Sequence, residues 1–143
     1  MQFAIEKSFI TYELAYALTQ SAIDHAKTLH LAICVAIVDT VGNLVSFAKM
    51  NDCNLIGIGT SQGKAYTAAM SGLSTRDFLS YLNENEVSLT SLKDEKLTLI
   101  AGGLPILYQG KLIGGIGTGG GTGKQDEECA QVALTVINSQ VIT

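Results

Sequence analysis

His25 is the residue of this chain whose type and position best suit metal binding. It shares a helical face with Leu14, Leu18 and Leu29, so its imidazole is expected to point into the protein or into a subunit contact. A neutral imidazole in an apolar pocket is a good axial ligand for iron. The alternative is a core histidine held by a hydrogen bond, as most buried polar groups are. His30, at the end of the same helix, is expected to be exposed and favoured by the helix dipole.

Three other side chains have the chemistry to contact an anionic ligand. Lys64 and Arg76 are cations that could pair with carboxylates, and Tyr66 lies two residues after Lys64. The alternative for both cations is a solvated surface position. Met50 and Met70 offer soft sulfur atoms, but isolated methionines are typical core residues.

A glycine-rich stretch, residues 114–123, could bring backbone amides together around a ligand. It is not a phosphate loop, because Thr118 replaces the required first glycine and Gln125 replaces the required Ser or Thr. Three of its glycines match the dinucleotide fingerprint literally, but that fingerprint needs a following helix and a second parallel strand. The chain that remains has no room for them, so we expect an ordinary turn from a strand into a helix.

Composition indicates one compact domain, residues 1–143, with 47% hydrophobic residues and one proline. The net charge is −4 with only nine Lys and Arg residues, which argues against nucleic-acid and anionic-membrane partners. Three distant cysteines favour reduced thiols in a cytoplasm over a disulfide framework or a zinc site. We expect neither a secretory signal nor a membrane span.

Hydrophobic periodicity predicts an α+β fold in which helices cover an antiparallel sheet. Residues 83–96 are polar and are expected to form an exposed loop. Gln109-Gly110 is expected to form a tight hairpin turn. The expected helices are 11–29, 55–70, one beginning near Ser74, and 126–137, and the expected strands are 31–38, 44–50, 97–101, 104–108 and 111–117.

Four motifs in register resemble the GlcG/HbpS-like haem-binding family, which includes the C-terminal domain of PduO. The resemblance implies an antiparallel five-stranded sheet flanked by helices, similar to profilin and sensor folds, in homo-oligomers. It also implies tetrapyrrole binding, haem above all. Corrinoid binding is implied less strongly, because the corrinoid adenosyltransferase of PduO is a separate domain. The motifs are Val35-Ala36-Ile37-Val38-Asp39 with Gly42-Asn43-Leu44, Lys64-Ala65-Tyr66-Thr67-Ala68, Gly102-Gly103-Leu104-Pro105-Ile106, and Ile113 to Gly117 running into Gly120-Gly121-Thr122 and Gln125-Asp126-Glu127.

The resemblance leads us to expect a cytoplasmic, oligomeric tetrapyrrole-binding protein. Some members of the family ligate haem through a histidine on the first helix, so His25 would bind the iron. The haem propionates would be met by Lys64, Tyr66 and Arg76, and the pocket wall would be shaped by Gly120, Gly121 and Thr122.

Two other functions stay open at this stage. The first is an enzyme, or an accessory to one, that acts on small hydroxy acids, diols or aldehydes. The sequence shows no set of residues placed for catalysis. Asp39 is expected to stabilise a turn, and the acidic residues 126–128 are expected to be favoured by the dipole at the start of a helix. The second is a structural or sensor-partner oligomer without a ligand. Haem degradation is also possible in the family.

Overall fold

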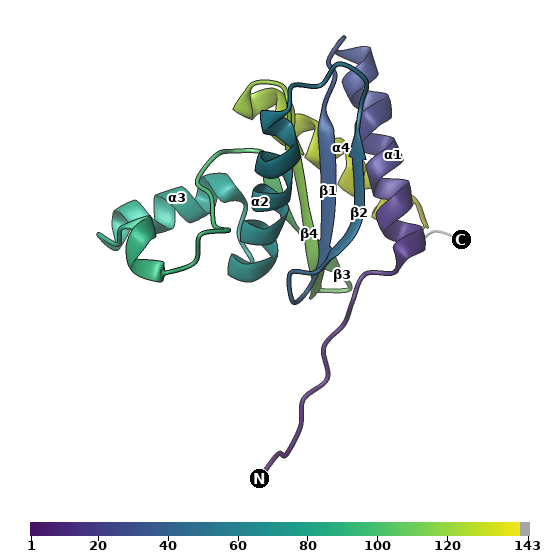
Figure 1. Ribbon diagram of the computed structural model, residues 1–143. Coiled ribbons are helices and arrows are strands. Elements are labelled where there is room, and N and C mark those ends of the chain that lie inside the picture. Colours follow the sequence, from purple (N-terminus) through teal and green to yellow (C-terminus); the bar gives the residue numbers. More distant parts are fainter. Residues whose placement is uncertain (141–143) are drawn as a thin grey trace.

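The computed structural model describes residues 1–140, without the side chain of Gln140. The predicted domain, 1–143, therefore includes three residues that lie outside the described part. Four α-helices and an antiparallel sheet form an α+β fold (Figure 1). The elements are α1 (Tyr12–Thr28), β1 (Cys34–Asp39), β2 (Leu44–Lys49), α2 (Ile56–Ser71), α3 (Thr75–Glu84), the 3-10 helix η1 (Leu89–Leu92), β3 (Gly103–Tyr108), β4 (Lys111–Gly119) and α4 (Gly123–Gln140).

The sheet has four strands within residues 1–140, in the order β2-β1-β4-β3, and every neighbouring pair is antiparallel. The expected fifth strand, 97–101, is wrong. The Thr98 amide donates to the Thr67 hydroxyl of α2 at 2.9 Å, and the Ile100 amide donates to the Thr98 hydroxyl at 3.3 Å. These amides are bound to side chains, so the segment follows α2 instead of extending the sheet.

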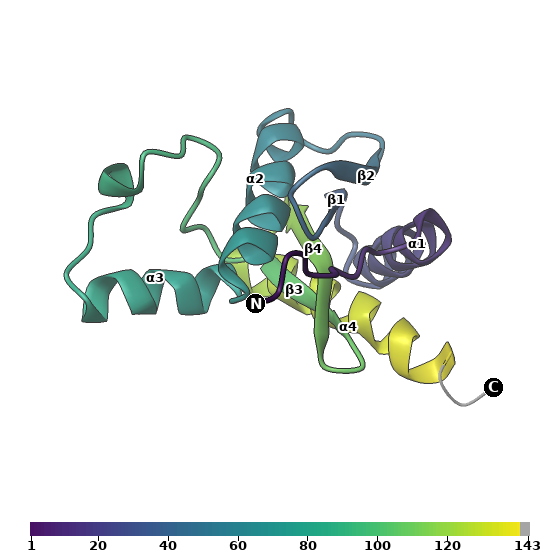
Figure 2. The ribbon, with the colours of Figure 1, turned by 90° about the horizontal axis from the view of Figure 1, so that it is seen from below.

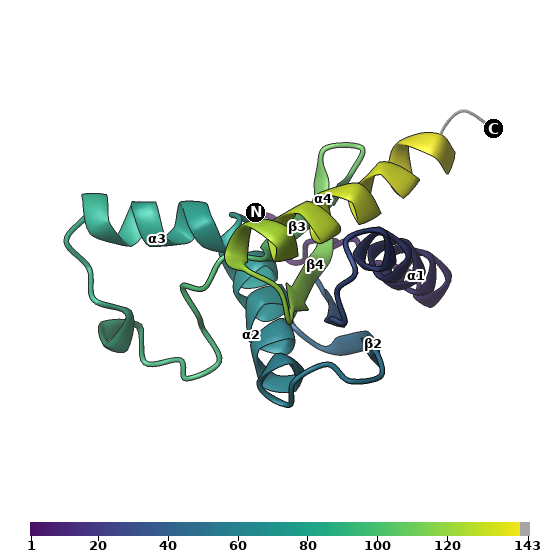
Figure 3. The same ribbon diagram turned by 90° about the horizontal axis from the view of Figure 1, so that it is seen from above.

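The helices form a layer on each face of the sheet. Figures 2 and 3 show α1 and α4 together on one face, α2 on the other, and α3 with η1 projecting to the side. Successive side chains of β1 point to opposite faces of the sheet, so this strand packs against both helical layers. Val35 and Ile37 belong to the core under α1 and α4, whereas Ala36 and Val38 pack with Ala65 of α2.

Glycines in β4 let α2 lie directly on the sheet. A side chain at Gly115 would overlap the carbonyl oxygen of Ala65, and one at Gly117 would overlap that of Ser61. Ile116, between them, points into the opposite core. The glycine-rich stretch is thus mainly a strand that permits close helix packing, and only its end is the expected turn.

Hydroxyl side chains cap α1 and α3. The Thr11 hydroxyl accepts from the Leu14 amide at 3.2 Å, and the Ser74 hydroxyl accepts from the Asp77 amide at 3.0 Å. The helix α4 begins three residues before the expected Asp126. The reason is a capping box at Thr122, whose hydroxyl accepts from the Gln125 amide while the Gln125 side chain accepts from the Thr122 amide.

Residues 1–9 form an extended N-terminal arm that leaves the body of the molecule (Figure 1). Its anchor is Ile10, which is buried and whose amide donates to the Ile113 carbonyl at 3.0 Å. Apolar side chains along the arm are exposed, with Phe3 at 91% and Ile5 at 71%.

Candidate functional site

The imidazole of His25 lies between α1 and α4 with an unused nitrogen. Its side chain is 23% exposed, and its Nε2 atom is buried without a hydrogen-bond partner in the part of the chain that the structure describes. The nearest charged group is the Glu128 carboxylate, at 3.5 Å from Nε2, too poorly placed to count as a hydrogen bond. A buried nitrogen without a partner is uncommon, and it is free to bind a ligand or a metal.

An open hollow of 610 Å³ lies beside this imidazole, and we call it the helical-face hollow. Seven of its lining residues come from α1, which presents two exposed tyrosines, Tyr12 and Tyr16, on the same side of the molecule. Its open shape leaves one side for a partner. The lining residues are Tyr16, Ala17, Gln20, Ser21, Asp24, His25, Thr28 and Val132.

A second hollow, of 460 Å³, adjoins the first turns of α4. The Arg76 guanidinium at its edge pairs with Glu127, with Nε 2.9 Å from the carboxylate. Glu128 borders this hollow and also lies against His25, so α4 connects the two places. Sequence reasoning missed Glu128 and Lys124 as site residues. Glu128 was missed because the dipole of α4 already accounted for the acidic residues at its start. The lining residues are Arg76, Lys124, Gln125, Glu127, Glu128 and Gln131.

Lys64 is not in either hollow. It is 2% exposed, and its ammonium donates to the Asp126 carboxylate at 3.0 Å and to the Thr118 carbonyl at 2.8 Å. The pair joins α2 to the start of α4 in the interior. The loop residues Gly121 and Thr122 are similarly engaged, because their amides donate to the side chains of Asp126 and Gln125. Gly120, at φ +128°, packs against the carbonyl of Ala32.

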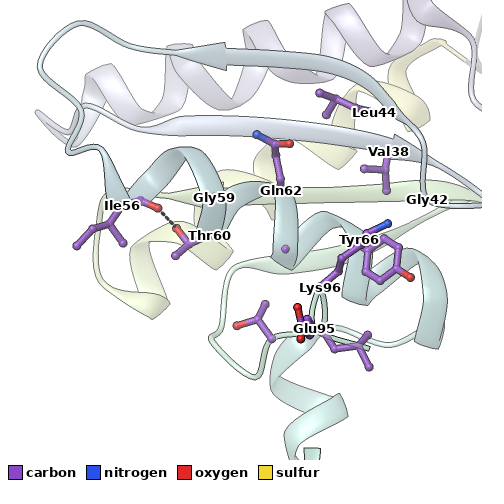
Figure 4. A pocket seen from close by; sticks show the side chains of 13 residues that line it. Val38, Gly42, Leu44, Ile56, Gly59, Thr60, Gln62, Tyr66, Glu95 and Lys96 are labelled. Carbon is purple, nitrogen blue, oxygen red and sulfur yellow. Dashed lines mark hydrogen bonds between the residues drawn. The ribbon is translucent and has the colours of Figure 1, made fainter. Parts of the chain in front are cut away.

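Tyr66 lies on the opposite face of the sheet, in a cavity of 690 Å³ that we call the α2 cavity (Figure 4). Its hydroxyl donates to the Asp94 carboxylate at 2.6 Å, and the Lys96 ammonium lies 5.2 Å from its ring centroid. The hydrogen bond raises the pKa of Tyr66 and lowers that of Asp94. The lining residues are Val38, Gly42, Leu44, Ile56, Gly59, Thr60, Gln62, Gly63, Tyr66, Glu95, Lys96, Leu97 and Thr98.

The other candidate ligands lie apart from these hollows. His30 is exposed at φ +56°. The Met50 sulfur accepts from the Ile33 amide at 3.3 Å, and Met70 is exposed near Gly42. Residues 1–140 contain no group of three or more His, Cys, Asp or Glu side chains placed to hold a metal ion. Among the helices described, none has the length and apolar character needed to cross a bilayer.

The three cysteines are buried free thiols. The sulfur atoms of Cys34 and Cys53 lie 3.3 Å apart, a contact between distant segments that spacing alone did not indicate. Burial raises the pKa of Cys34 to about 12, with a further contribution from the contact with Cys53. Burial and then the nearby charges of Asp126 and Glu128 raise the pKa of Cys129 to about 11. Thiols held in this way are protonated at neutral pH and are poor nucleophiles.

The described residues thus form an α+β protein in which a buried imidazole nitrogen, beside an open hollow, makes no hydrogen bond. The family model "Haem degrading protein HbpS-like" matches residues 10–135. The chain belongs to this HbpS-like family, as its four sequence motifs predicted.

Relatives of known sequence and structure support this assignment. The chain is 30% identical over 128 residues to an uncharacterized 15.0 kDa protein of the dhaT-dhaS intergenic region of Citrobacter freundii, covering 87% of this chain and 89% of that one. It is 30% identical over 132 residues to the corrinoid adenosyltransferase PduO of Salmonella typhimurium, covering 90% of this chain but only 39% of PduO. The solved PduOC:heme complex has a TM-score of 0.82 at 30% identity, covering 91% of this chain and 96% of that one.

Proposed function

We propose that this protein binds haem, or a closely related tetrapyrrole, at the helical-face hollow. The observation that carries the proposal is the buried Nε2 of His25, which has no hydrogen-bond partner in residues 1–140 and lies beside a hollow of 610 Å³. The structure of a PduOC:heme complex, from a relative in the same family, supports haem as the ligand. Bound haem would supply an iron atom that the imidazole of His25 could ligate.

His25 would bind the iron through Nε2, and the Glu128 carboxylate beside this nitrogen would have to move aside. The carboxylate of Glu128 lies 3.5 Å from Nε2, so a small movement would free this nitrogen for the metal. Arg76 and Lys124, at the adjoining hollow, would meet the propionates. Arg76 is 54% exposed and uses its Nε on Glu127, so its remaining N–H groups are available for carboxylates.

Lys64 and the Gly120-Gly121-Thr122 turn support the fold of this site instead of contacting the ligand, and Tyr66 takes no part in the site. Lys64 is already bound to Asp126, and the amides of Gly121 and Thr122 are bound to α4 side chains. Tyr66 faces the α2 cavity, across the sheet from His25. This assignment replaces the expected ligand set with one centred on α1 and α4.

We propose that a second copy of the chain completes the hollow in a homo-oligomer. The hollow is open, and Tyr12 and Tyr16 on the same helix are 72% and 70% exposed. Exposed aromatic residues beside a shallow site are typical of a surface that another molecule covers. The three free thiols agree with a reducing compartment such as the cytoplasm.

Titration of the purified protein with hemin, followed by the Soret band, tests the proposal. We expect saturable binding, and we expect His25→Ala to shift the Soret maximum and weaken binding about tenfold or more. His30→Asn is the matched control, because it removes an exposed imidazole and asparagine tolerates a positive φ.

An unchanged spectrum and affinity in His25→Ala would remove the ligand assignment. A parallel titration with cobalamin distinguishes a corrinoid site from a haem site. Saturable binding of cobalamin without binding of hemin would overturn haem as the ligand.

A further inference from the structure

The α2 cavity lies on the sheet face opposite the helical-face hollow and belongs to no part of the proposed haem site. Its 690 Å³ falls within the range of small-molecule sites in proteins. We propose that it binds a small organic anion with a flat apolar body, such as an aromatic carboxylate or sulfonate. Four features of its walls support this assignment.

The first feature is a glycine that the packing of α2 does not require. A Cβ atom built at Gly59 meets no atom within 4 Å in the described chain, so the position opens onto empty space. Glycine inside a helix is unfavourable relative to alanine. Gly57, by contrast, is needed, because a Cβ there would lie 3.1 Å from the Cys53 sulfur and 3.2 Å from the Cys34 sulfur. Gly59 is exposed and borders the cavity, so it weakens α2 without a packing reason and leaves the edge of the cavity free of a side chain.

The second feature is an apolar floor with an aromatic wall. Val38 and Leu44 approach the cavity from the β1–β2 side, and the Tyr66 ring stands on the other side (Figure 4). The hydrogen bond from Tyr66 to Asp94, at 2.6 Å, fixes the position of the outer end of this ring. A rigid ring opposite aliphatic side chains suits a flat apolar group.

The third feature is a cation, Lys96, that makes no ion pair within 4.0 Å in the described chain, although the Glu95 carboxylate lines the same cavity. The Lys96 ammonium lies over the Tyr66 ring, and no carboxylate oxygen of residues 1–140 lies within 4.0 Å of it. The nearby Asp94 is already occupied, because it accepts from the Tyr66 hydroxyl and from the Lys96 amide. The ammonium is therefore available to an anionic group of a ligand in the cavity.

The fourth feature is an amide with unused hydrogen-bonding capacity. Gln62 donates one N–H to the Ile58 carbonyl of its own helix at 3.1 Å. Its second N–H and its carbonyl oxygen have no partner in the described structure, and Figure 4 shows the side chain directed toward β1. It can donate to the same anionic group or accept from a ligand hydroxyl.

Two fluorescent probes test the charge preference directly. 1-Anilinonaphthalene-8-sulfonate carries a sulfonate, and N-phenyl-1-naphthylamine has the same aromatic body without a charge. We expect the sulfonate to bind saturably and more tightly than the neutral probe. Backbone amide shifts in ¹⁵N NMR spectra of the wild-type protein are expected to change at Gly59, Gly63, Lys96 and Thr98.

Two variants test the walls. Gly59→Leu places a bulky side chain at the exposed edge of the cavity and obstructs it, so we expect sulfonate binding to weaken about tenfold. The urea midpoint is expected to rise, because leucine favours helix. Lys96→Met is expected to weaken binding about three- to fivefold, the size of an exposed ion pair. Lys93→Met is the matched control, because this nearby lysine does not line the cavity.

Three results would overturn the proposal. They are equal binding in Gly59→Leu, shift changes confined to α1 and α4, and displacement of the probe by hemin. Hemin binding is expected to be unchanged in Gly59→Leu, so failure of the haem site and failure of the α2 cavity give different results.

Discussion

The hydrogen bond from Tyr66 to Asp94 makes part of the stability depend on pH. Asp94 has a pKa below its usual 3.8, so its contribution is present above about pH 3.8 and is lost as the pH falls through the lowered value. Tyr66 has a pKa above its usual 10.0, so its contribution is present below about pH 10 and is lost as the pH rises through the raised value. The bond therefore stabilises the fold between these limits.

We expect Tyr66→Phe to be less stable than the wild type near pH 7, and we expect the difference to shrink as the pH falls through the lowered pKa of Asp94. Phenylalanine keeps the ring beside Lys96 and removes only the hydroxyl. Urea unfolding near pH 7 and at the acidic end of this range measures the difference. An equal difference at both would show that the hydroxyl stabilises the fold without the charge of Asp94.

Single residues were predicted from sequence only where their role is local. The periodicity of α1 placed His25 on a partly buried face. The burial of Lys64 was missed, although Ser61, Ala65 and Ala68 beside it are small and buried. A lysine among small residues on a helix face is the signal that could have indicated burial. Its partner Asp126 lies 62 positions away, and no local pattern links them.

At the scale of elements, the Lys64–Asp126 pair fastens α2 to the beginning of α4. Both side chains are almost fully buried, and Asp126 also accepts from the Gly121 amide at 2.9 Å. We expect Lys64→Met to lower the free energy of unfolding by about 3–5 kcal/mol, because it leaves a buried carboxylate without its cation. Urea denaturation measures the loss.

The exposed pair of Arg76 and Glu127 provides the control. Arg76→Met breaks it and is expected to cost no more than about 1 kcal/mol. The double variant Lys64→Met/Asp126→Asn removes both charges while keeping an acceptor for Gly121, and is expected to recover part of the loss. Equal losses in Lys64→Met and Arg76→Met would contradict a role for burial.

Most elements followed from sequence patterns, with errors at their ends. The loop expected at 83–96 was wrong in part, because α3 extends to Glu84 and the 3-10 helix η1 lies at Leu89–Leu92. The hairpin at Gln109-Gly110 was confirmed, with both residues at positive φ. The strand expected at 97–101 is wrong. Apolar residues alone do not show whether a segment pairs with the edge strand of a sheet. That segment is held by Thr67 of α2, a contact that depends on tertiary structure.

At the scale of the whole molecule, the N-terminal arm is suited to contact another copy. Met1, Phe3 and Ile5 alternate along an extended chain, so they share one side, and all three are exposed. We expect removal of residues 1–9 to reduce the mass of the proposed oligomer and leave the fold intact, because the anchor Ile10 remains. Light scattering and circular dichroism measure the two quantities.

A variant that keeps the length of the arm separates contact from chain length. Phe3→Ser/Ile5→Ser is expected to behave like the deletion, whereas Gln2→Ser is expected to behave like the wild type. An unchanged mass after the deletion would show that the arm is not part of the interface.

The overall arrangement was predictable, but the grouping of site residues was not. The resemblance to the family indicated helices around an antiparallel sheet. Tyr66 and His25 nevertheless lie on opposite faces, because α2 packs on the face that the glycines of β4 leave bare. Which face that is depends on the pairing of β4 with β1 and β3, which no single segment determines.

The bare glycine face of β4 also fixes the alignment of the strands. Gly115 and Gly117 lie under α2 with no room for a side chain, and Ile116 and Thr118 alternate with them on the other face. A slip of one position would turn the strand over and drive Ile116 and Thr118 into the helix backbone. The backbone of α2 can therefore pack on β4 in one register only. Misaligned pairings of β4 clash with the helix and are rejected while the sheet assembles.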